Sequence, residues 1–254
     1  MRRAGLSAGC LAAVAALLVA GCGNKSTSSS TSTALDPRSP TQVVADKAAA
    51  EGAVLKLADL PPGWTAQPSS GDSSRSAEQR SAEAEFADCA GVDPAFIGAG
   101  RESATRAKSE FSGDAERQVE SSVTVVATRE AAKKQLDSVR KGTVPACLAK
   151  FVDRAIRSSI ETPKAGVTPP TGVTFDDAKV TLLNLPGLHA TSVGYRTTVP
   201  VRVGDRAVDV NLDIVLALSG RTGISMTFTS FGSRFAEDAE ISLTNAVIDR
   251  APST

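Results

Sequence analysis

The last third of the chain contains the pattern that most restricts the fold, because apolar and polar residues alternate there over a long stretch. Apolar side chains occupy every second position from Val208 to Leu218, and Asp209, Asn211 and Asp213 lie between the first of them. A period of two is typical of a β-strand with one buried face, and the acidic half of the other face is expected to contact water. This segment predicts a long strand in an antiparallel sheet.

Neighbouring segments extend the prediction to a four-stranded meander followed by a helix. The predicted strands cover residues 173–184, 190–203, 206–218 and 223–230. Gly204 and Asp205 form a short polar link between the second and third strands, which favours an antiparallel hairpin. A helix is expected over 233–250, where Phe235, Leu243 and Val247 share one apolar stripe.

The first two thirds of the folded region predict mostly helices. Helical spacing of apolar residues indicates helices over 41–57, 77–89, 129–141 and 145–158, whereas 106–112 and 118–128 predict a strand pair. Helices and strands are segregated rather than strictly alternating. The expected fold class is therefore α+β, with helices packed on one side of an antiparallel β-sheet.

The N-terminus has the features of a secretion signal. Arg2 and Arg3 precede an apolar stretch over 11–20, and the sequence Val19-Ala20-Gly21-Cys22 resembles the lipobox that directs acylation of a cysteine and cleavage before it. An uncleaved membrane helix is the alternative, but the apolar stretch is short for a bilayer and no charged stop-transfer cluster follows. We expect a signal peptide at 1–21 and a lipid on Cys22.

The segment after Cys22 predicts a tether rather than a folded element. Residues 26–33 are all Ser or Thr, and Pro37 and Pro40 follow, so residues 22–40 bury too little apolar area to offset chain entropy. The expected organisation is a lipidated tether at 22–40 and a single α+β domain at 41–254. The lipid anchor would place this domain on the extracytoplasmic face of the cell membrane.

The cysteines fit an oxidising compartment. Cys10 would leave with the signal peptide and Cys22 would be acylated, so Cys89 and Cys147 remain as an even pair. We expect a disulfide between them, which in the chain-entropy model would stabilise the domain by about 4 kcal/mol. Two unpaired buried thiols are the alternative.

Charge and composition exclude some partners. The chain has 28 basic and 28 acidic residues, and aromatic residues make up only 4%. A balanced charge gives no reason to expect nucleic-acid binding, and the few aromatics provide poor platforms for base stacking.

Searching the sequence for catalytic groups gives little. His189 is the single histidine, and no Gly-x-Ser-x-Gly elbow accompanies it. Ser138 and Lys141 match the Ser-x-x-Lys spacing of penicillin-recognising enzymes, but the other motifs of those enzymes are missing. We expect no catalysis, no metal site and no cofactor.

Four residues are candidates for ligand binding. Asp209, Asn211 and Asp213 share one strand face and would suit a cation or a polar ligand, although a solvated sheet face explains them equally well. Trp64 follows Pro-Pro-Gly and would contact a ligand or, more commonly for a lone Trp, seal the edge of the core.

The motif Leu-Pro-Pro-Gly-Trp at Leu60–Trp64, the cysteine pair and the order of elements carry a resemblance. The chain resembles actinobacterial envelope lipoproteins, is similar to the extracellular sensor domain of PknH-type receptor kinases, and more distantly looks like the PsbP-like fold of the LpqN lipoproteins. The resemblance implies a ligand-binding module without chemistry of its own. This chain departs from the sensor domain in having one expected disulfide instead of two and no kinase segment.

The sequence thus leads to three hypotheses. The first is a membrane-anchored, non-catalytic ligand-binding or sensor-accessory module, with an apolar cleft between sheet and helices for a small ligand or a cell-wall fragment. The second is a protein-interaction module of the envelope that docks through Asp209, Asn211 and Asp213. The third is a hydrolase.

Overall fold

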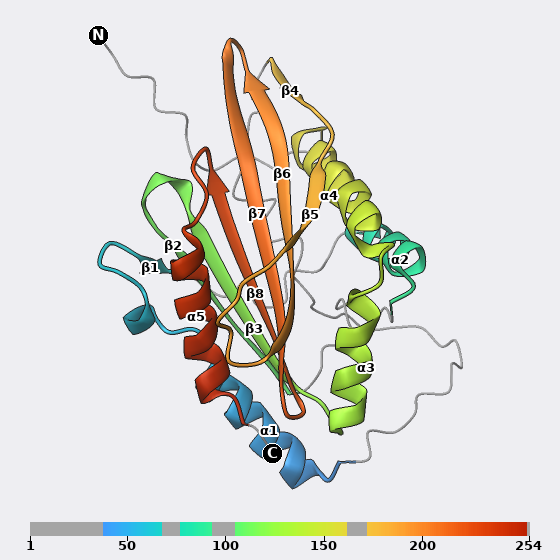
Figure 1. Ribbon diagram of the computed structural model, residues 1–254, viewed down its shortest axis with the longest axis vertical. Helices are drawn as coiled ribbons and strands as arrows, with labels where there is room; N and C mark the ends of the chain where they lie inside the picture. The colour runs from blue at the N-terminus through green and yellow to red at the C-terminus, as the bar shows by residue number, and fades with distance from the viewer. Residues whose placement is uncertain (1–37, 68–76, 93–104, 162–171, 253–254) are drawn as a thin grey trace.

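A computed structural model of the chain describes residues 38–67, 77–92, 105–161 and 172–252 (Figure 1). The predicted signal peptide, Cys22 and nearly all of the predicted tether lie outside the described residues. The helices are α1 (Pro40–Ala53), α2 (Ala77–Ala90), α3 (Arg129–Val139), α4 (Val144–Glu161) and α5 (Glu237–Arg250). The strands are β1 (Thr65–Ala66), β2 (Arg106–Ser112), β3 (Gln118–Val125), β4 (Val173–Phe175), β5 (Lys179–Leu183), β6 (Thr191–Val203), β7 (Arg206–Ser219) and β8 (Thr222–Phe231).

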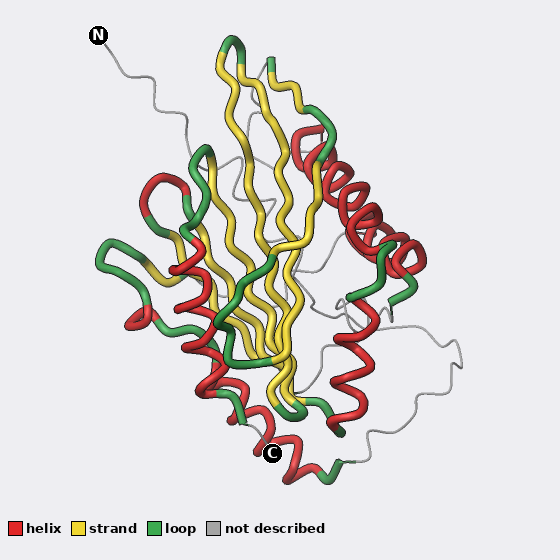
Figure 2. The backbone as a smooth tube through the Cα atoms, in the orientation of Figure 1, coloured by secondary structure: helices red, strands yellow, loops and turns green. Residues whose placement is uncertain are grey.

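The strands form one antiparallel sheet, which is shown in yellow in Figure 2. Its order is β1-β2-β3-β8-β7-β6-β4, and β5 also pairs with β6. The β6–β7 hairpin turns at Gly204 and Asp205, as predicted, and Gly204 adopts a φ of 60°, which a glycine reaches without a steric penalty. The predicted α+β class and the antiparallel meander are confirmed.

Helices pack on both faces of this sheet, which corrects the expectation that they lie on one side. On β7, Val210 and Leu212 belong to one buried cluster, whereas Val215 and Ala217 point to the opposite face and belong to another. The first cluster includes residues of α2, α3 and α4, and the second includes residues of α1 and α5. Each face of the long central strands is apolar over part of its length, so each face needs its own helices.

The two helix layers cover different parts of the sheet. Helix α1 contacts β2 and β3, and α5 contacts β7 and β8. On the other face, α4 contacts β5 and β6, and α3 contacts β6, β7 and β8. Phe228 and Met226 are fully buried under α1 and α5, and Ile156 of α4 is equally buried on the opposite side.

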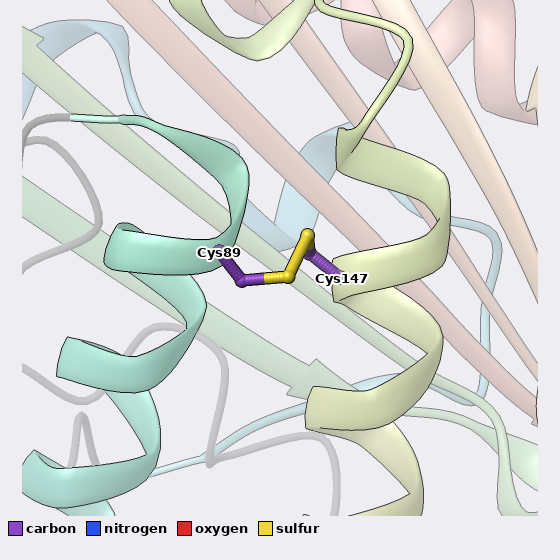
Figure 3. The surroundings of a disulfide bond; sticks show 2 residues. All are labelled: Cys89 and Cys147. Atoms are coloured by element: carbon purple, nitrogen blue, oxygen red, sulfur yellow. A yellow bond between two sulfur atoms is a disulfide. The ribbon is translucent and has the colours of Figure 1, made fainter.

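A disulfide between Cys89 and Cys147 joins α2 to α4, so the predicted pairing is confirmed (Figure 3). The two cysteines are separated by 58 positions in the sequence, and their Cα atoms lie 5.8 Å apart. The bridge closes a long loop and attaches α2 to the helix that covers β5 and β6.

The first and last helices also brace each other. Arg250 of α5 donates hydrogen bonds to the backbone oxygen of Val54 at 3.1 Å and to Asp59 at 2.8 and 2.9 Å. Nearby, the buried carboxylate of Asp46 in α1 accepts hydrogen bonds from Arg221 and from Arg38. Hydrogen bonding from Arg221, more than any other contact, lowers the pKa of Asp46 to about 2.

We find no helix within the described ranges that combines the length and the hydropathy needed to cross a membrane.

Candidate functional site

The structure places Asp209, Asn211 and Asp213 on one face of β7, as predicted, but only Asp209 is exposed. Asn211 and Asp213 are each 2% exposed. The expectation of a wet face is therefore wrong for these two residues. The reason is that β6 lies beside them with Arg196 and Thr198 opposite in register, and α5 packs over the same face.

Asp213 belongs to a partly buried network of charged groups, which we call the Arg196 cluster (Arg196, Asp213, Glu237 and Glu240). The Nε and Nη2 atoms of Arg196 donate to the Asp213 carboxylate at 2.8 to 3.1 Å. Nη1 of Arg196 also donates to Glu237 at 3.4 Å, and Nη2 lies 3.8 Å from Glu240. A forked contact of this kind holds both side chains in one geometry.

Glu240 is the unusual member of the Arg196 cluster. Its side chain is fully buried, and in the described structure no donor reaches its carboxyl oxygens, so an ionised Glu240 would be unsatisfied. Burial first, and then the neighbouring Asp213 carboxylate, raises the pKa of Glu240 to about 9. Glu240 is therefore a neutral acid at pH 7, and Arg196 neutralises Asp213 instead.

Asn211 is engaged by its own neighbours. Its side-chain nitrogen donates to the backbone oxygen of Gly232 at 3.0 Å, and its side-chain oxygen accepts from Arg234 at 2.9 Å. Arg234 also donates to Thr198 at 2.8 Å. These contacts satisfy the amide within the fold, so Asn211 and Asp213 act as structural residues here.

Trp64 lies at the edge of the core that α1 and α5 cover. Its ring centroid is 6.1 Å from that of Phe235, which in turn contacts Phe228. A Cβ atom at Gly113 would come within 2.6 Å of the Trp64 ring, so the indole packs directly on this glycine backbone. The geometry fits a side chain that seals the core edge.

A second set of polar residues lies on the opposite sheet face, where the predicted sites did not place one. We call it the β2–β3–β8 polar face. It consists of Lys108 and Glu110 on β2, Gln118 and Glu120 on β3, and Thr227 and Thr229 on β8. Because Ala107, Val119 and Met226 face α1 and α5, the alternate residues on these strands must face the other way.

Strand pairing arranges this face in two rows. Glu110, Glu120 and Thr227 are directly opposite one another across the three strands, and Ser112, Gln118 and Thr229 form the next row. Neighbouring strands lie about 4.8 Å apart, so the groups form a closely spaced grid.

Two groups on the β2–β3–β8 polar face are buried without a partner. Gln118 Oε1 and Thr229 Oγ1 are buried, and neither has a hydrogen-bond partner among the residues that the structure describes. Thr197 Oγ1, in the same row beyond Leu212, is also buried and unpaired. Buried polar groups are nearly always hydrogen-bonded, so neighbouring unpaired atoms point to a missing polar partner.

The two carboxyl groups of this face, Glu110 and Glu120, have raised pKa values. Glu120 lies 3.8 Å from the Lys108 ammonium, and its side chain is 12% exposed. Burial raises the pKa of Glu110, and burial, as the largest of several effects, raises the pKa of Glu120 to about 7. Like charges directly opposite on neighbouring strands destabilise a sheet, so the Glu110–Glu120 pair has no evident structural benefit.

The sequence contains one signal for this face. Strands are predicted over 106–112 and 118–128, and polar residues occupy every second position over 106–112 and over 118–124. Neither segment alone predicts the register of the strands. The register places Glu110 opposite Glu120 and Gln118 opposite Thr229.

Each of the groups considered for catalysis contacts a neighbouring part of the fold. Ser138 donates to the backbone oxygen of Gln135 at 2.7 Å, and Lys141 donates to the backbone oxygen of Gly91. His189 is exposed, and its Nδ1 atom lies 2.8 Å from Asp249. In the part of the chain that the structure covers, no group of three or more His, Cys, Asp or Glu residues has the geometry to hold a metal ion.

Comparisons with known proteins show only a weak similarity. No protein-family model and no curated protein sequence matches the chain. Among solved structures, the extracellular domain of PknH from Mycobacterium tuberculosis is similar with a TM-score of 0.32 and 12% sequence identity. The match covers 57% of this chain and 63% of that domain, which is less than two thirds of its length. The resemblance to the LpqN lipoproteins stays a prediction.

Proposed function

We propose that this chain is a non-catalytic, extracytoplasmic ligand-binding module, and that the β2–β3–β8 polar face is its binding surface. One observation carries the proposal: Gln118 Oε1 and Thr229 Oγ1 come from residues paired across β3 and β8, and both atoms are buried and unpaired within the described part of the chain. A buried group without a partner destabilises a fold by about 1–3 kcal/mol. A ligand that hydrogen-bonds to both atoms would recover that free energy on binding.

The other predicted surface supports binding less well. Docking through Asp209, Asn211 and Asp213 needs all three side chains at the surface, but two of them are buried and hydrogen-bonded within the fold. Trp64 packs on Gly113 and Phe235 instead of lining an open face. The alternative of an envelope protein as the partner therefore needs another surface.

Secretion and anchoring are part of the proposal. The leader-like segment 1–21, Cys22 and the disulfide between Cys89 and Cys147 fit a protein exported to an oxidising space. We expect lipid on Cys22 to hold the domain at the outer side of the cell membrane. Mass spectrometry of the mature N-terminal peptide tests this, because an unmodified Cys22 or an intact leader contradicts it.

Native mass spectrometry of the full-length protein, purified from its own envelope in detergent, tests for a retained ligand. We expect a bound small molecule in the wild type and its loss in the double variant Gln118→Leu/Thr229→Val, which removes both unpaired groups. The variant Asp209→Ala, on the exposed part of β7, serves as the matched control and should keep the ligand.

Two results would contradict the proposed surface. The first is a ligand that the double variant retains fully, and the second is a ligand that Asp209→Ala loses. Thermal unfolding of each variant shows whether its fold is intact, so that a lost ligand is not confused with a lost structure.

A further inference from the structure

The point at which the chain enters the described domain lies beside the start of α3. Arg38, two residues before α1, donates to the backbone oxygen of Val125 at 2.8 Å. Val125 is the last residue of β3, and Thr128, which caps α3, follows three positions later. Figure 1 shows α1 and the start of α3 at the same end of the sheet. A membrane anchor attached through the segment before Arg38 would therefore hold this end of the domain nearest to the lipid.

Helix α3 exposes mainly basic side chains. It buries Ala132, Leu136 and Val139. Residues 129–141 include five basic and two acidic residues, a net charge of +3, within a chain whose basic and acidic residues balance. All of these charged side chains are exposed, and we call the basic ones the α3 basic face: Arg129, Lys133, Lys134, Arg140 and Lys141.

The contacts within the domain leave most of this charge uncompensated. Lys133 and Arg140 share one acid, Asp137, at 2.7 and 3.7 Å. Lys141 donates to a backbone oxygen, which carries no net charge. Ion pairs between exposed side chains are weak, so these contacts do not prevent an anionic partner from approaching.

Arg129 and Lys134 are the least committed members of the α3 basic face. Within the residues that the structure describes, neither forms an ion pair or a side-chain hydrogen bond. Both lie in the first two turns of α3, next to the point where the chain enters the domain. Two free cationic groups are therefore placed where a membrane anchor would bring the lipid surface closest.

The opposite side of the sheet carries the other sign of charge. The exposed charged residues of α5 are Glu237, Asp238 and Asp249, which are all acidic. Helices α3 and α5 contact the same two strands, β7 and β8, from opposite faces. The domain is thus polarised across the sheet, and a negatively charged surface attracts the α3 side and repels the α5 side.

The predicted tether is short enough to keep α3 within reach of the lipid. A flexible chain of the 16 positions from Cys22 to Arg38 spans about 22 Å on average, which is similar to the length of α3, about 16 Å. An anchor on Cys22 would already confine the domain to the membrane, so the α3 basic face does not need to capture lipid from solution. A modest attraction is then enough to set the orientation.

We infer that the α3 basic face docks on anionic phospholipid headgroups and sets the orientation of the domain on the membrane. The inference rests on the proposed lipid anchor at Cys22 and goes beyond it, because an anchor alone leaves the domain free to rotate. Arg129, Lys133 and Lys134 face the lipid, where each provides charged donors for phosphate oxygens. The β6–β7 turn, at the other end of the sheet, then points away from the membrane.

Lysine labelling of the full-length, acylated protein tests this orientation. The protein is inserted into preformed vesicles of phosphatidylcholine, alone or with about 30% phosphatidylglycerol, and is acetylated with a neutral succinimidyl ester. Mass spectrometry of the peptides then reports the reactivity of each lysine. We expect labelling of Lys133 and Lys134 to fall about threefold in the anionic vesicles, and to recover in about 1 M salt, where the Debye length is about 3 Å.

Lys179 is the internal reference. It is exposed on β5 and pairs with Thr198 of β6, six residues farther along β6 than Ser192, which Arg140 of α3 contacts. Each strand residue rises about 3.3 Å, so Lys179 lies about 20 Å farther from the anchored end of the sheet. Its labelling should be the same in both kinds of vesicle.

A pair of charge-matched variants locates the contact. Arg129→Gln/Lys134→Gln removes the two free cations of α3, and Lys133 should then be labelled in anionic vesicles as strongly as in neutral ones. Arg202→Gln/Arg206→Gln removes two exposed cations next to the β6–β7 turn and should keep the protection of Lys133. Thermal unfolding of each variant shows whether its fold is intact.

Four results would overturn the inference: equal labelling of Lys133 in both kinds of vesicle, equal protection of Lys179, continued protection in Arg129→Gln/Lys134→Gln, and lost protection in Arg202→Gln/Arg206→Gln. The proposed anchor is judged separately, by the mass of the N-terminal peptide. An acylated Cys22 with unprotected lysines leaves the anchor standing and removes only the orientation. An unmodified Cys22 removes both.

Discussion

The Arg196 cluster and the β2–β3–β8 polar face both remove carboxyl groups from water, but they differ in how the charge is handled. In the Arg196 cluster, Asp213 has a forked contact with Arg196, and α5 seals the group from solvent. On the polar face, Glu120 has a lysine at 3.8 Å, and Gln118 and Thr229 beside it have unpaired atoms. The first arrangement supports the fold, whereas the second leaves hydrogen-bonding capacity that a ligand would use.

The comparison shows that burial alone does not identify a functional polar group. Asp213 is the more buried of the two acids, yet its partners explain it completely. Glu120 is less buried, and it is the unused capacity around it that needs an explanation.

The largest expected effect on stability is in the Arg196 cluster. Asp213→Ala leaves the partly buried guanidinium of Arg196 without the carboxylate that balances it, which should reduce the free energy of unfolding by about 3–5 kcal/mol. Urea unfolding at pH 7 measures this. A loss below 1 kcal/mol would show that the cluster is more solvated than its geometry indicates.

The second prediction concerns pH. Glu240 in the unfolded chain has an ordinary pKa near 4.5, and in the fold its pKa is about 9. Between these values the folded state keeps a proton that the unfolded state has released, so stability falls as pH rises through this range. The slope for one proton is at most about 1.4 kcal/mol per pH unit.

The variant Glu240→Gln isolates this contribution. It cannot ionise, so its free energy of unfolding should change less between pH 5 and pH 8 than that of the wild type. Glu120, with a pKa of about 7, gives a weaker trend of the same sign. Identical pH profiles for Glu240→Gln and the wild type would contradict the neutral state of Glu240.

The third prediction is a gain in stability on the β2–β3–β8 polar face, in contrast to the loss expected for Asp213→Ala. Gln118→Leu/Thr229→Val replaces unpaired polar groups with apolar ones and should raise the free energy of unfolding by about 1 kcal/mol in the absence of ligand. The control is Ser121→Ala, also on β3 but facing α1. Ser121 Oγ accepts from the backbone nitrogen of Leu55 at 2.9 Å, so this variant should lose about 1–3 kcal/mol.

The smallest effect is expected at Asp209. Its side chain is exposed near the start of β7, so Asp209→Ala should change the free energy of unfolding by less than about 0.5 kcal/mol. Chemical denaturation compares it directly with Asp213→Ala, four residues along the same strand face. Equal losses in the two variants would remove the distinction between exposed and sealed positions.

The positions of most helices and strands could be predicted from the sequence. The predicted strand over 206–218 corresponds to β7, and the helix over 129–141 corresponds to α3, because residue spacing reports directly on local periodicity. Spacing did not report which face each helix covers. Val210 and Val215 look alike in the sequence, and only the assembled sheet shows that they face different helices.

The candidate site was harder to predict for a related reason. Asp213 alternates with apolar neighbours in the same way as Asp209, and an alternating acid has the same pattern whether it contacts water or a buried arginine. Arg196 becomes its partner through the register of β6 with β7. Glu110 and Glu120 also become neighbours only through register, which local sequence patterns do not contain.

Two arginines give the domain a mechanical property. Arg250 holds the chain just after α1, and Arg221, next to β8, holds Asp46 inside α1. A pulling force that enters through the N-terminal segment reaches α1 first and is passed by these contacts to the last helix and to a central strand. Because α1 is tied to two other parts of the fold, it should not peel away on its own.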